Sequence, residues 1–313
     1  MTTSDHGRPP PRKAPSLDKE FLQFLTRKSS WLGILKVGLY FASIVFLVWL
    51  HFAYASALLT GFIVVAMGCL FAHGLELQHE ALHQNLFRGP FLNRAIGTVL
   101  GLPMLVSYTH YKSYHFHHHI AVGTQDDEEI VDYSMDSLRN PMKLIARAWN
   151  VTRIPRFFLV LAGMLRGHYP PRVKRNNRKP LLREYVLMAA IFAAMALVAL
   201  IFRSWAPVIL WFAPWLLVAE PMHFVIEVPE HLGCDRRTSS ILRNTRSYRT
   251  SFLWGYVANH NNYHIEHHLW PAVASHRLHH LHRHVIEADG HCSDGFWRAL
   301  GEVNQAARSS GQF

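Results

Sequence analysis

Three short clusters, HEALH, HFHHH and HIEHH, contain eight histidines with the spacing of one helix face, while His117 lies between them in the second cluster. The eight are His79, His83, His115, His118, His119, His264, His267 and His268. Imidazole is the commonest side-chain ligand for metal ions in proteins, and residues at i, i+3 and i+4 share one face of a helix. Each cluster can therefore direct its imidazoles at one point, and together the clusters predict a metal centre.

The number of imidazoles indicates two metal ions. A catalytic zinc ion takes three protein ligands and keeps one position for water or substrate, so eight imidazoles exceed what one ion needs. Two ions of a redox metal with open positions for oxygen would use the whole set, and iron suits such a nitrogen-rich site. A single HxxxH run could equally be a polar surface segment, but three clusters with a repeated pattern favour an oxidative metalloenzyme.

Four apolar runs flank the clusters, and each approaches the roughly 20 residues that a helix needs to cross a bilayer. They predict transmembrane helices at about residues 31–52, 55–76, 185–203 and 206–228. Because the runs are nearly uncharged over their whole length, burial inside a soluble protein is the weaker interpretation. We therefore expect an all-α integral membrane protein with four transmembrane helices in two hairpins.

The positive charges avoid the two hairpin loops. All lysines and arginines except Lys36 and Arg203 lie before the first hairpin, between the two hairpins or after the second. The positive-inside rule then places both termini and all three clusters on the cytoplasmic side of a bacterial inner membrane or of the endoplasmic reticulum. The net charge of +11 fits contact with anionic lipid. We expect no nucleic-acid partner, because the sequence shows no motif for one.

These patterns divide the chain into three parts. Residues 1–20 are expected to be a disordered tail, residues 21–287 a single membrane domain, and residues 288–313 a C-terminal tail. Within the membrane domain, residues 77–184 and 229–287 are expected to form a cytoplasmic helical cap that holds the dinuclear metal site.

The clusters and their flanks resemble the membrane fatty acid desaturases. These are histidine-box diiron proteins, whose superfamily includes hydroxylases, acetylenases and carotenoid ketolases. The resemblance runs from about His73 to His284, and three segments carry it: HEALHQNLF, YKSYHFHHHIAVGTQDDEE and NTRSYRTSFLWGYVANHNNYHIEHH. In that family the matching histidines bind iron. The resemblance therefore implies that all eight clustered histidines are iron ligands.

The resemblance also implies a ninth ligand. Relatives carry a further histidine at the cytoplasmic end of the fourth membrane helix, and here the segment EVPEHLG places His231 there. Acyl-CoA desaturases have an asparagine four residues before that histidine, which contacts iron through water, whereas this chain has Glu227. Glu227 is an additional candidate ligand, either directly or through water; its other interpretation is an acid at a helix end.

Metal-bound imidazoles usually donate their second ring nitrogen to an acid or a carbonyl group. Acidic residues in or beside the clusters are candidates for this role, and the spacing does not show which acid reaches which imidazole. They are Glu80, Asp126, Asp127, Glu128, Glu129 and Glu266.

The implied reaction is oxygen-dependent desaturation of a fatty acyl chain. Acidic and basic side chains cannot break an unactivated C–H bond, so two irons and O2 would supply the driving force while the protein supplies position. The sequence shows no nucleotide-binding fingerprint and no iron–sulfur cysteine pattern, which implies an external ferredoxin or cytochrome-type electron donor. The acyl chain could arrive on a lipid, on coenzyme A or on an acyl-carrier protein.

Other functions stay open. Hydroxylation, acetylenation and carotenoid oxygenation use the same ligands. A membrane zinc protease is a more distant alternative, because HEALH fits HExxH with Glu80 as the general base, although the other two clusters would then have no role. A metal transporter would line a path across the bilayer with its ligands, whereas these clusters lie beyond the helix ends.

Overall fold

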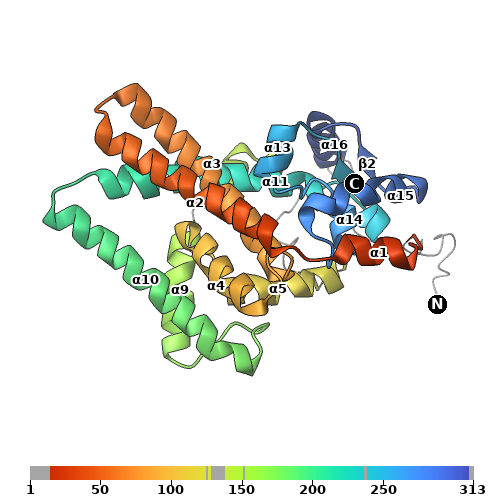
Figure 1. The fold of residues 1–313 in the computed structure, drawn as a ribbon, viewed down its shortest axis with the longest axis horizontal. Helices are drawn as coiled ribbons and strands as arrows, with labels where there is room; N and C mark the ends of the chain where they lie inside the picture. Colours follow the sequence, from red (N-terminus) through yellow and green to blue (C-terminus); the bar gives the residue numbers. More distant parts are fainter. Residues whose placement is uncertain (1–14, 125, 128–137, 151, 236–237, 310–313) are drawn as a thin grey trace.

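The computed structural model shows a helical molecule, with long helices at one end and a group of short helices at the other (Figure 1). The structure describes residues 15–124, 126–127, 138–150, 152–235 and 238–309. Within these ranges, strands are confined to the two-residue elements β1 (Ser247–Tyr248) and β2 (Cys292–Ser293), which pair in parallel. The predicted all-α class is therefore confirmed.

In the described part of the chain, four helices are long and apolar enough to cross a membrane. They are α2 (Ser30–Ala53), α3 (Ala57–Leu82), α10 (Arg178–Ile201) and a helical stretch from Val208 to His231. Short links join α2 to α3 and α10 to the fourth stretch, and both links lie at the end of the molecule away from the short helices (Figure 1). The four predicted membrane helices are thus present, arranged as two hairpins.

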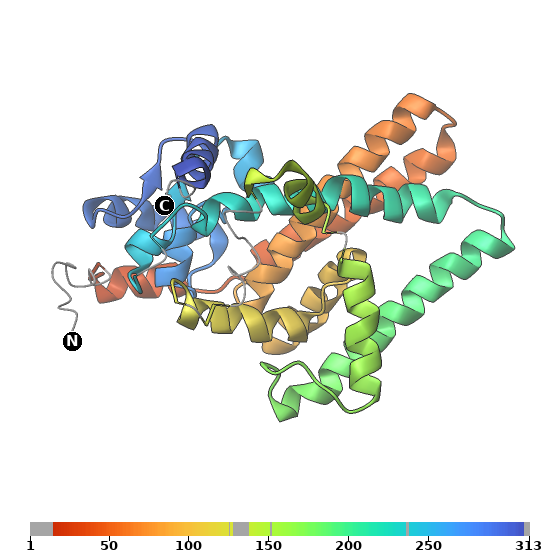
Figure 2. The same cartoon turned by 180° about the vertical axis from the view of Figure 1, so that it is seen from behind.

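The fourth stretch changes its hydrogen-bond pattern along its length. It begins with the π-helical segments η3 (Val208–Phe212) and η4 (Pro214–Ala219) and continues as α11 (Glu220–His231). Proline has no amide hydrogen and interrupts the α-helical pattern, and the prolines Pro214 and Pro221 flank the change. Figure 2 shows this stretch running from the tip of α10 past α3 to the short helices.

The largest departures from the predicted boundaries of the membrane helices are in α3 and α10. Helix α3 continues past residue 76 to Leu82, and α10 begins at Arg178 and not at residue 185. A membrane helix predicted from hydropathy ends where polar residues begin. The polar side chains near the end of α3 are buried inside the protein, so the helix continues beyond that point. The cluster HEALH therefore belongs to the end of a membrane-length helix.

Short helices form the remainder of the fold, which we call the cap. The α-helices are α1 (Lys19–Thr26), α4 (Pro90–Gly101), α5 (Tyr108–Ala121), α8 (Pro141–Ala148), α9 (Arg153–Leu165), α12 (Ile241–Asn244), α13 (Phe252–Val257), α14 (His264–Leu269), α15 (His282–Glu287) and α16 (Phe296–Ser309). The 3-10 turns are η1 (Leu102–Met104), η2 (Arg175–Asn177) and η5 (Ser275–Leu281).

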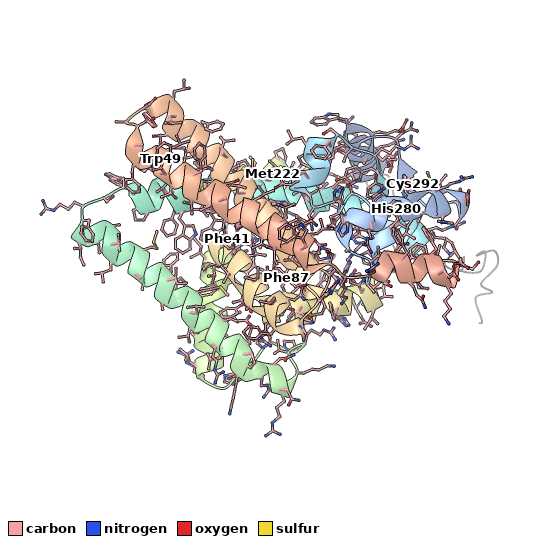
Figure 3. All side chains as sticks on the ribbon, viewed as in Figure 1. Phe41, Trp49, Phe87, Met222, His280 and Cys292 are labelled. Atoms are coloured by element: carbon pink, nitrogen blue, oxygen red, sulfur yellow. The ribbon has the colours of Figure 1, made fainter. Side chains whose placement is uncertain are left out.

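The cap and the first hairpin link lie toward opposite ends of the molecule. Figure 3 shows this with two labelled residues, Trp49 near the link between α2 and α3 and His280 in the cap.

The segment 288–313, predicted as a tail, contains α16, and this helix packs against α11. Its buried side chains Ala299, Val303 and Ala307 recur every four residues, so one face of α16 is apolar and covered. Most of the N-terminal tail predicted over residues 1–20 lies outside the described residues, and α1 begins at Lys19.

Helix α3 is the centre of the bundle and packs against α2, α4 and η4. Gly68 lies where α3 crosses η4, and a Cβ atom at this position would lie 2.3 Å from Cβ of Val218 and 2.7 Å from the carbonyl oxygen of Pro214. Small residues allow membrane helices to approach this closely. The crossing brings the ends of α3 and α11 together, and both ends carry histidines.

We expect Gly68→Ala to lower the free energy of unfolding by about 1–3 kcal/mol, because the added methyl group overpacks the crossing. Gly61→Ala is the matched control on the same helix, since nothing lies within 4 Å of a Cβ there. Thermal unfolding of the two purified variants in detergent measures the difference. Equal stability of both variants would contradict the close crossing.

Candidate metal centre

All nine histidines predicted as ligands come together in the structure, in two groups. One ring nitrogen of each member lies within 4.8 Å of those of the other members of its group. The five-histidine group contains His79, His83, His115, His119 and His267, and the four-histidine group contains His118, His231, His264 and His268. The candidate ligand Glu227 belongs to neither group.

The five-histidine group is built from the ends of three helices. The Nε2 atoms of His79, His83 and His119 each lie 2.9 Å from Nε2 of His115. His267 completes the group from α14, with its Nε2 atom 3.1 Å from that of His119. Helices α3, α5 and α14 thus converge on one point.

The four-histidine group lies beside the first. Its Nε2 atoms are 3.1 Å apart between His118 and His231, 3.0 Å apart between His231 and His264, and 3.1 Å apart between His264 and His268. His231 reaches the group from the C-terminal end of α11. The ninth histidine, which the resemblance to the desaturases implied, therefore joins the others in space.

The two HxxHH clusters are divided between the groups in the same way. On α5, the first and last histidines of the cluster belong to the five-histidine group and His118 belongs to the other. On α14, the first and last belong to the four-histidine group and His267 belongs to the other. On the helix face shared by i, i+3 and i+4, the residues i+3 and i+4 lie on opposite sides of i, about 100° apart around the helix axis. The repeated pattern thus lets α5 and α14 each contribute to both groups.

The nitrogen spacing fits metal coordination. For a metal–nitrogen bond of about 2.1 Å, two ligands at a right angle lie about 3.0 Å apart and two at a tetrahedral angle about 3.4 Å apart. The observed distances between neighbouring Nε2 atoms, 2.9 to 3.1 Å, match the right angle. The residues therefore fit a metal with more than four ligands better than tetrahedral zinc.

The electrostatics of the groups also fit metal binding. Burial lowers the pKa values of His264, His267 and His268 well below that of free histidine, and neighbouring imidazoles lower them further. These rings are therefore neutral, and a neutral ring that donates from Nδ1 presents a lone pair on Nε2. Buried lone pairs that face each other repel, and a cation between them removes that repulsion.

In three rings of the four-histidine group, the Nδ1 atom points to an oxygen acceptor. Nδ1 of His118 lies 3.0 Å from both carboxylate oxygens of Asp127, and Nδ1 of His231 donates to the carbonyl oxygen of Asn244 at 3.1 Å. Nδ1 of His264 lies 3.1 Å from Oδ1 of Asn261. Such contacts fix the tautomer and leave Nε2 for a metal. Of the acids considered from the sequence, Asp127 takes this role; Glu128 and Glu129 lie outside the described residues.

Two other acids of the clusters point to the scaffold. Oε2 of Glu80 accepts hydrogen bonds from Nζ of Lys36 at 2.8 Å and from Nδ2 of Asn259 at 2.9 Å. Glu266 accepts from Oγ of Ser247 at 2.5 Å and pairs with Nδ1 of His282 at 2.6 Å. The ion pair with Lys36 disfavours the zinc-protease alternative, because it occupies the proposed general base.

Glu184 on α10 holds the N-terminal end of α5. Its carboxylate accepts from the backbone N–H of Thr109 at 2.8 Å, from Oγ1 of the same residue at 2.6 Å and from Oγ of Ser107 at 2.6 Å. A negative charge is favoured at a helix N-terminus. The third membrane helix thus orients α5. The sequence analysis did not predict the roles of Glu184 and Lys36, because each residue contacts a segment that is distant in the sequence.

A cavity lies beside the four-histidine group. Its lining includes Glu76, Glu227, Glu230, Tyr111 and Asn261, together with histidines of both groups. Glu227 therefore reaches the same cavity as the groups, and its carboxylate lies 3.5 Å from Nε2 of His223. A small molecule in this cavity would contact both candidate metal positions.

A family model described as fatty acid desaturase matches residues 48–297. The matched range covers most of the chain and contains all nine histidines and both hairpin links. No curated protein matches the chain.

We expect Asp127→Asn to weaken metal binding by about 10- to 100-fold, because it removes the charge that orients His118 and makes its ring more basic. Asp126→Asn is the matched control, since Asp126 is exposed and contacts His117 through its backbone oxygen. Competition with a chelator, followed by metal analysis, measures the affinity. The same retention in both variants would argue against the orienting role of Asp127.

Proposed function

The chain belongs to the fatty acid desaturase family, and from this premise we propose that it introduces a double bond into a fatty acyl chain. The reaction removes one hydrogen from each of two neighbouring carbons, while O2, two electrons and two protons form two molecules of water. The convergence of nine imidazoles on two neighbouring points carries the proposal. Two irons bound there would supply the oxidising power that an unactivated C–H bond requires.

We assign iron to the site because of its donors. Imidazole nitrogens suit iron. The distances between neighbouring Nε2 atoms correspond to angles near 90° at a bound metal, which suit ions with more than four ligands. The proposed ligands are the members of the two groups: His79, His83, His115, His119 and His267 for one iron, and His118, His231, His264 and His268 for the other.

The acyl chain would occupy a cleft between α5 and α9. This cleft has a volume of about 800 Å³, within the range of ligand pockets. Leu105, Phe157 and Val160 supply apolar walls, and the exposed Arg156 lies on the same side as a positive group for the polar carrier of the acyl chain. That carrier would be a lipid, coenzyme A or an acyl-carrier protein.

Tyr111 would position the chain next to the irons. It lines both the cleft and the cavity beside the four-histidine group. Its ring centroid lies 5.5 Å from that of His115 and 6.3 Å from that of His79. An aromatic ring at this junction would hold a methylene group near the metals and limit the entry of water.

We expect a host that expresses the chain to contain a new unsaturated fatty acid, and expect His118→Ala to abolish it because a proposed ligand is lost. His117→Ala is the matched control, since the neighbouring ring contacts the backbone oxygen of Asp126 and lies outside both groups. Mass spectrometry of the total lipids measures the product.

A hydroxyl group in place of the double bond, or an oxidised carotenoid with unchanged acyl chains, would contradict desaturation. Product formation by His118→Ala at the level of the unchanged protein would contradict the proposed site.

We also propose that the cap and both termini face the cytoplasm, where a ferredoxin or cytochrome-type protein supplies electrons. The distribution of lysine and arginine supports this orientation. The hairpin links lie at the end of the molecule opposite the cap, which agrees with a metal centre near one membrane surface (Figures 1 and 2).

In a variant whose three native cysteines are replaced by serine, we expect Ser56→Cys, in the first hairpin link, to react with an impermeant maleimide added outside intact bacterial spheroplasts. Ser309→Cys, at the end of α16, should react only after lysis. Labelling is measured on gels. The reverse pattern would contradict the proposed orientation.

A further inference from the structure

Glu230 lies next to His231 at the end of α11, and its side chain is buried. Its two oxygens have different neighbours. Oε1 accepts a hydrogen bond from Nδ2 of Asn261 at 2.6 Å, and Oε2 lies 3.4 Å from Nε2 of His264. Asn261 in turn lies against Nδ1 of His264. Glu230 therefore reaches both sides of one imidazole, directly on one side and through an amide on the other.

The carboxylate of Glu230 determines which atoms of Asn261 and His264 donate hydrogen bonds and which accept them. A carboxylate accepts only, so the NH2 group of Asn261 must face Glu230 and its oxygen must face His264. Nδ1 of His264 then donates, which leaves a lone pair on Nε2. That lone pair and Oε2 of Glu230 are both acceptors, and they lie 3.4 Å apart inside the protein.

A cation that lies against both of these buried acceptors would stabilise them. The Nε2 atoms of His231 and His268 lie 3.0 and 3.1 Å from the same Nε2 atom of His264, so these three rings converge on one point. A metal ion at that point would attract the carboxylate as well as the imidazoles. For bonds of about 2.1 Å, donors 3.4 Å apart subtend a nearly tetrahedral angle, which a five-coordinate ion accommodates.

The two groups also differ in number. One offers five imidazoles and the other four, and Glu230 lines the same cavity as three members of the smaller group, His118, His231 and His264. We propose that Glu230 is a carboxylate ligand of the iron in the four-histidine group. The inference rests on the proposed diiron function. It makes the two irons chemically unequal, with five imidazoles at one and four imidazoles and a carboxylate at the other.

This inequality has a redox consequence. An anionic oxygen donor stabilises ferric iron more than a neutral imidazole does. An iron bound by Glu230 would therefore have the lower reduction potential, and an iron in the five-histidine group would accept an electron more readily.

Glu227 is the alternative source of a carboxylate, because it lines the same cavity one helical turn earlier. Its carboxylate lies 3.5 Å from His223, whereas Glu230 contacts a member of the four-histidine group. The structure thus favours Glu230, and the two residues can be compared by the same substitution.

The test uses the full-length protein, purified in detergent and loaded with iron-57. Glu230→Ala and Glu230→Gln are compared with Glu227→Gln and with Glu287→Gln, a control in an exposed pair with Arg283. Iron retained against a chelator is measured by mass spectrometry, and the iron environments are measured by Mössbauer spectroscopy. In Glu230→Gln the side chain keeps its shape and can still accept from Asn261, so this variant decides the matter if Glu230→Ala does not fold.

We expect the unchanged protein and Glu287→Gln to hold two irons with two distinct Mössbauer signals. Both Glu230 variants should bind one of these irons at least about 10-fold more weakly, and the signal of that iron should change while the other stays. Glu227→Gln should keep both irons.

Equal iron retention and unchanged signals in the Glu230 variants would overturn the inference and leave the proposed function intact. Loss of iron in Glu227→Gln, with both irons kept in Glu230→Gln, would assign the carboxylate to Glu227 and overturn it as well. An unchanged protein that binds no iron would overturn the inference and the proposed function together.

Discussion

The structure depends on the convergence of nine imidazoles, seven of them buried, on two neighbouring points. Burial lowers the pKa values of His264, His267 and His268 well below that of free histidine, and a cation between neutral rings whose Nε2 atoms lie 2.9 to 3.1 Å apart would offset the cost of burying them. The surrounding elements hold the rings in this arrangement. The long helices α3 and α11 bring two histidine-bearing ends together, and α5 and α14 lie across them so that each serves both groups.

Buried acids provide much of this positioning. Asp127 contacts the ring of His118 directly. Glu80 joins α3 to Lys36, Glu184 joins α10 to the start of α5, and Glu266 joins α14 to His282. A buried carboxylate is costly without partners, so each of these acids fixes the segment that supplies its partner. The pairing with Lys36 is long-range, because it connects α2 to the end of α3 and to the loop near Asn259.

The part of the site that depends on local spacing could be predicted from the sequence. An HxxHH run directs its rings by helix geometry alone, and the number of imidazoles by itself indicates two metal positions. His231 required the resemblance to a family, since a single histidine has no pattern. The long apolar runs predicted the four membrane helices, although hydropathy ended α3 early because its last turns are polar and buried.

Contacts between distant segments could not be predicted. Nothing in the spacing of Glu230 and Asn261 shows that they meet at His264, and Lys36 looked like an isolated charge in an apolar run. The helix α16 was missed because its buried face consists of small residues and one valine. In each case the partner is set by tertiary packing, which the order of residues along one segment does not encode.

Anomalous diffraction from crystals of the unchanged protein tests the central claim most directly. Data collected on both sides of the iron absorption edge should show two iron peaks, one enclosed by the five-histidine group and one by the four-histidine group. A single peak, or two peaks that appear at the zinc edge and not at the iron edge, would contradict the account.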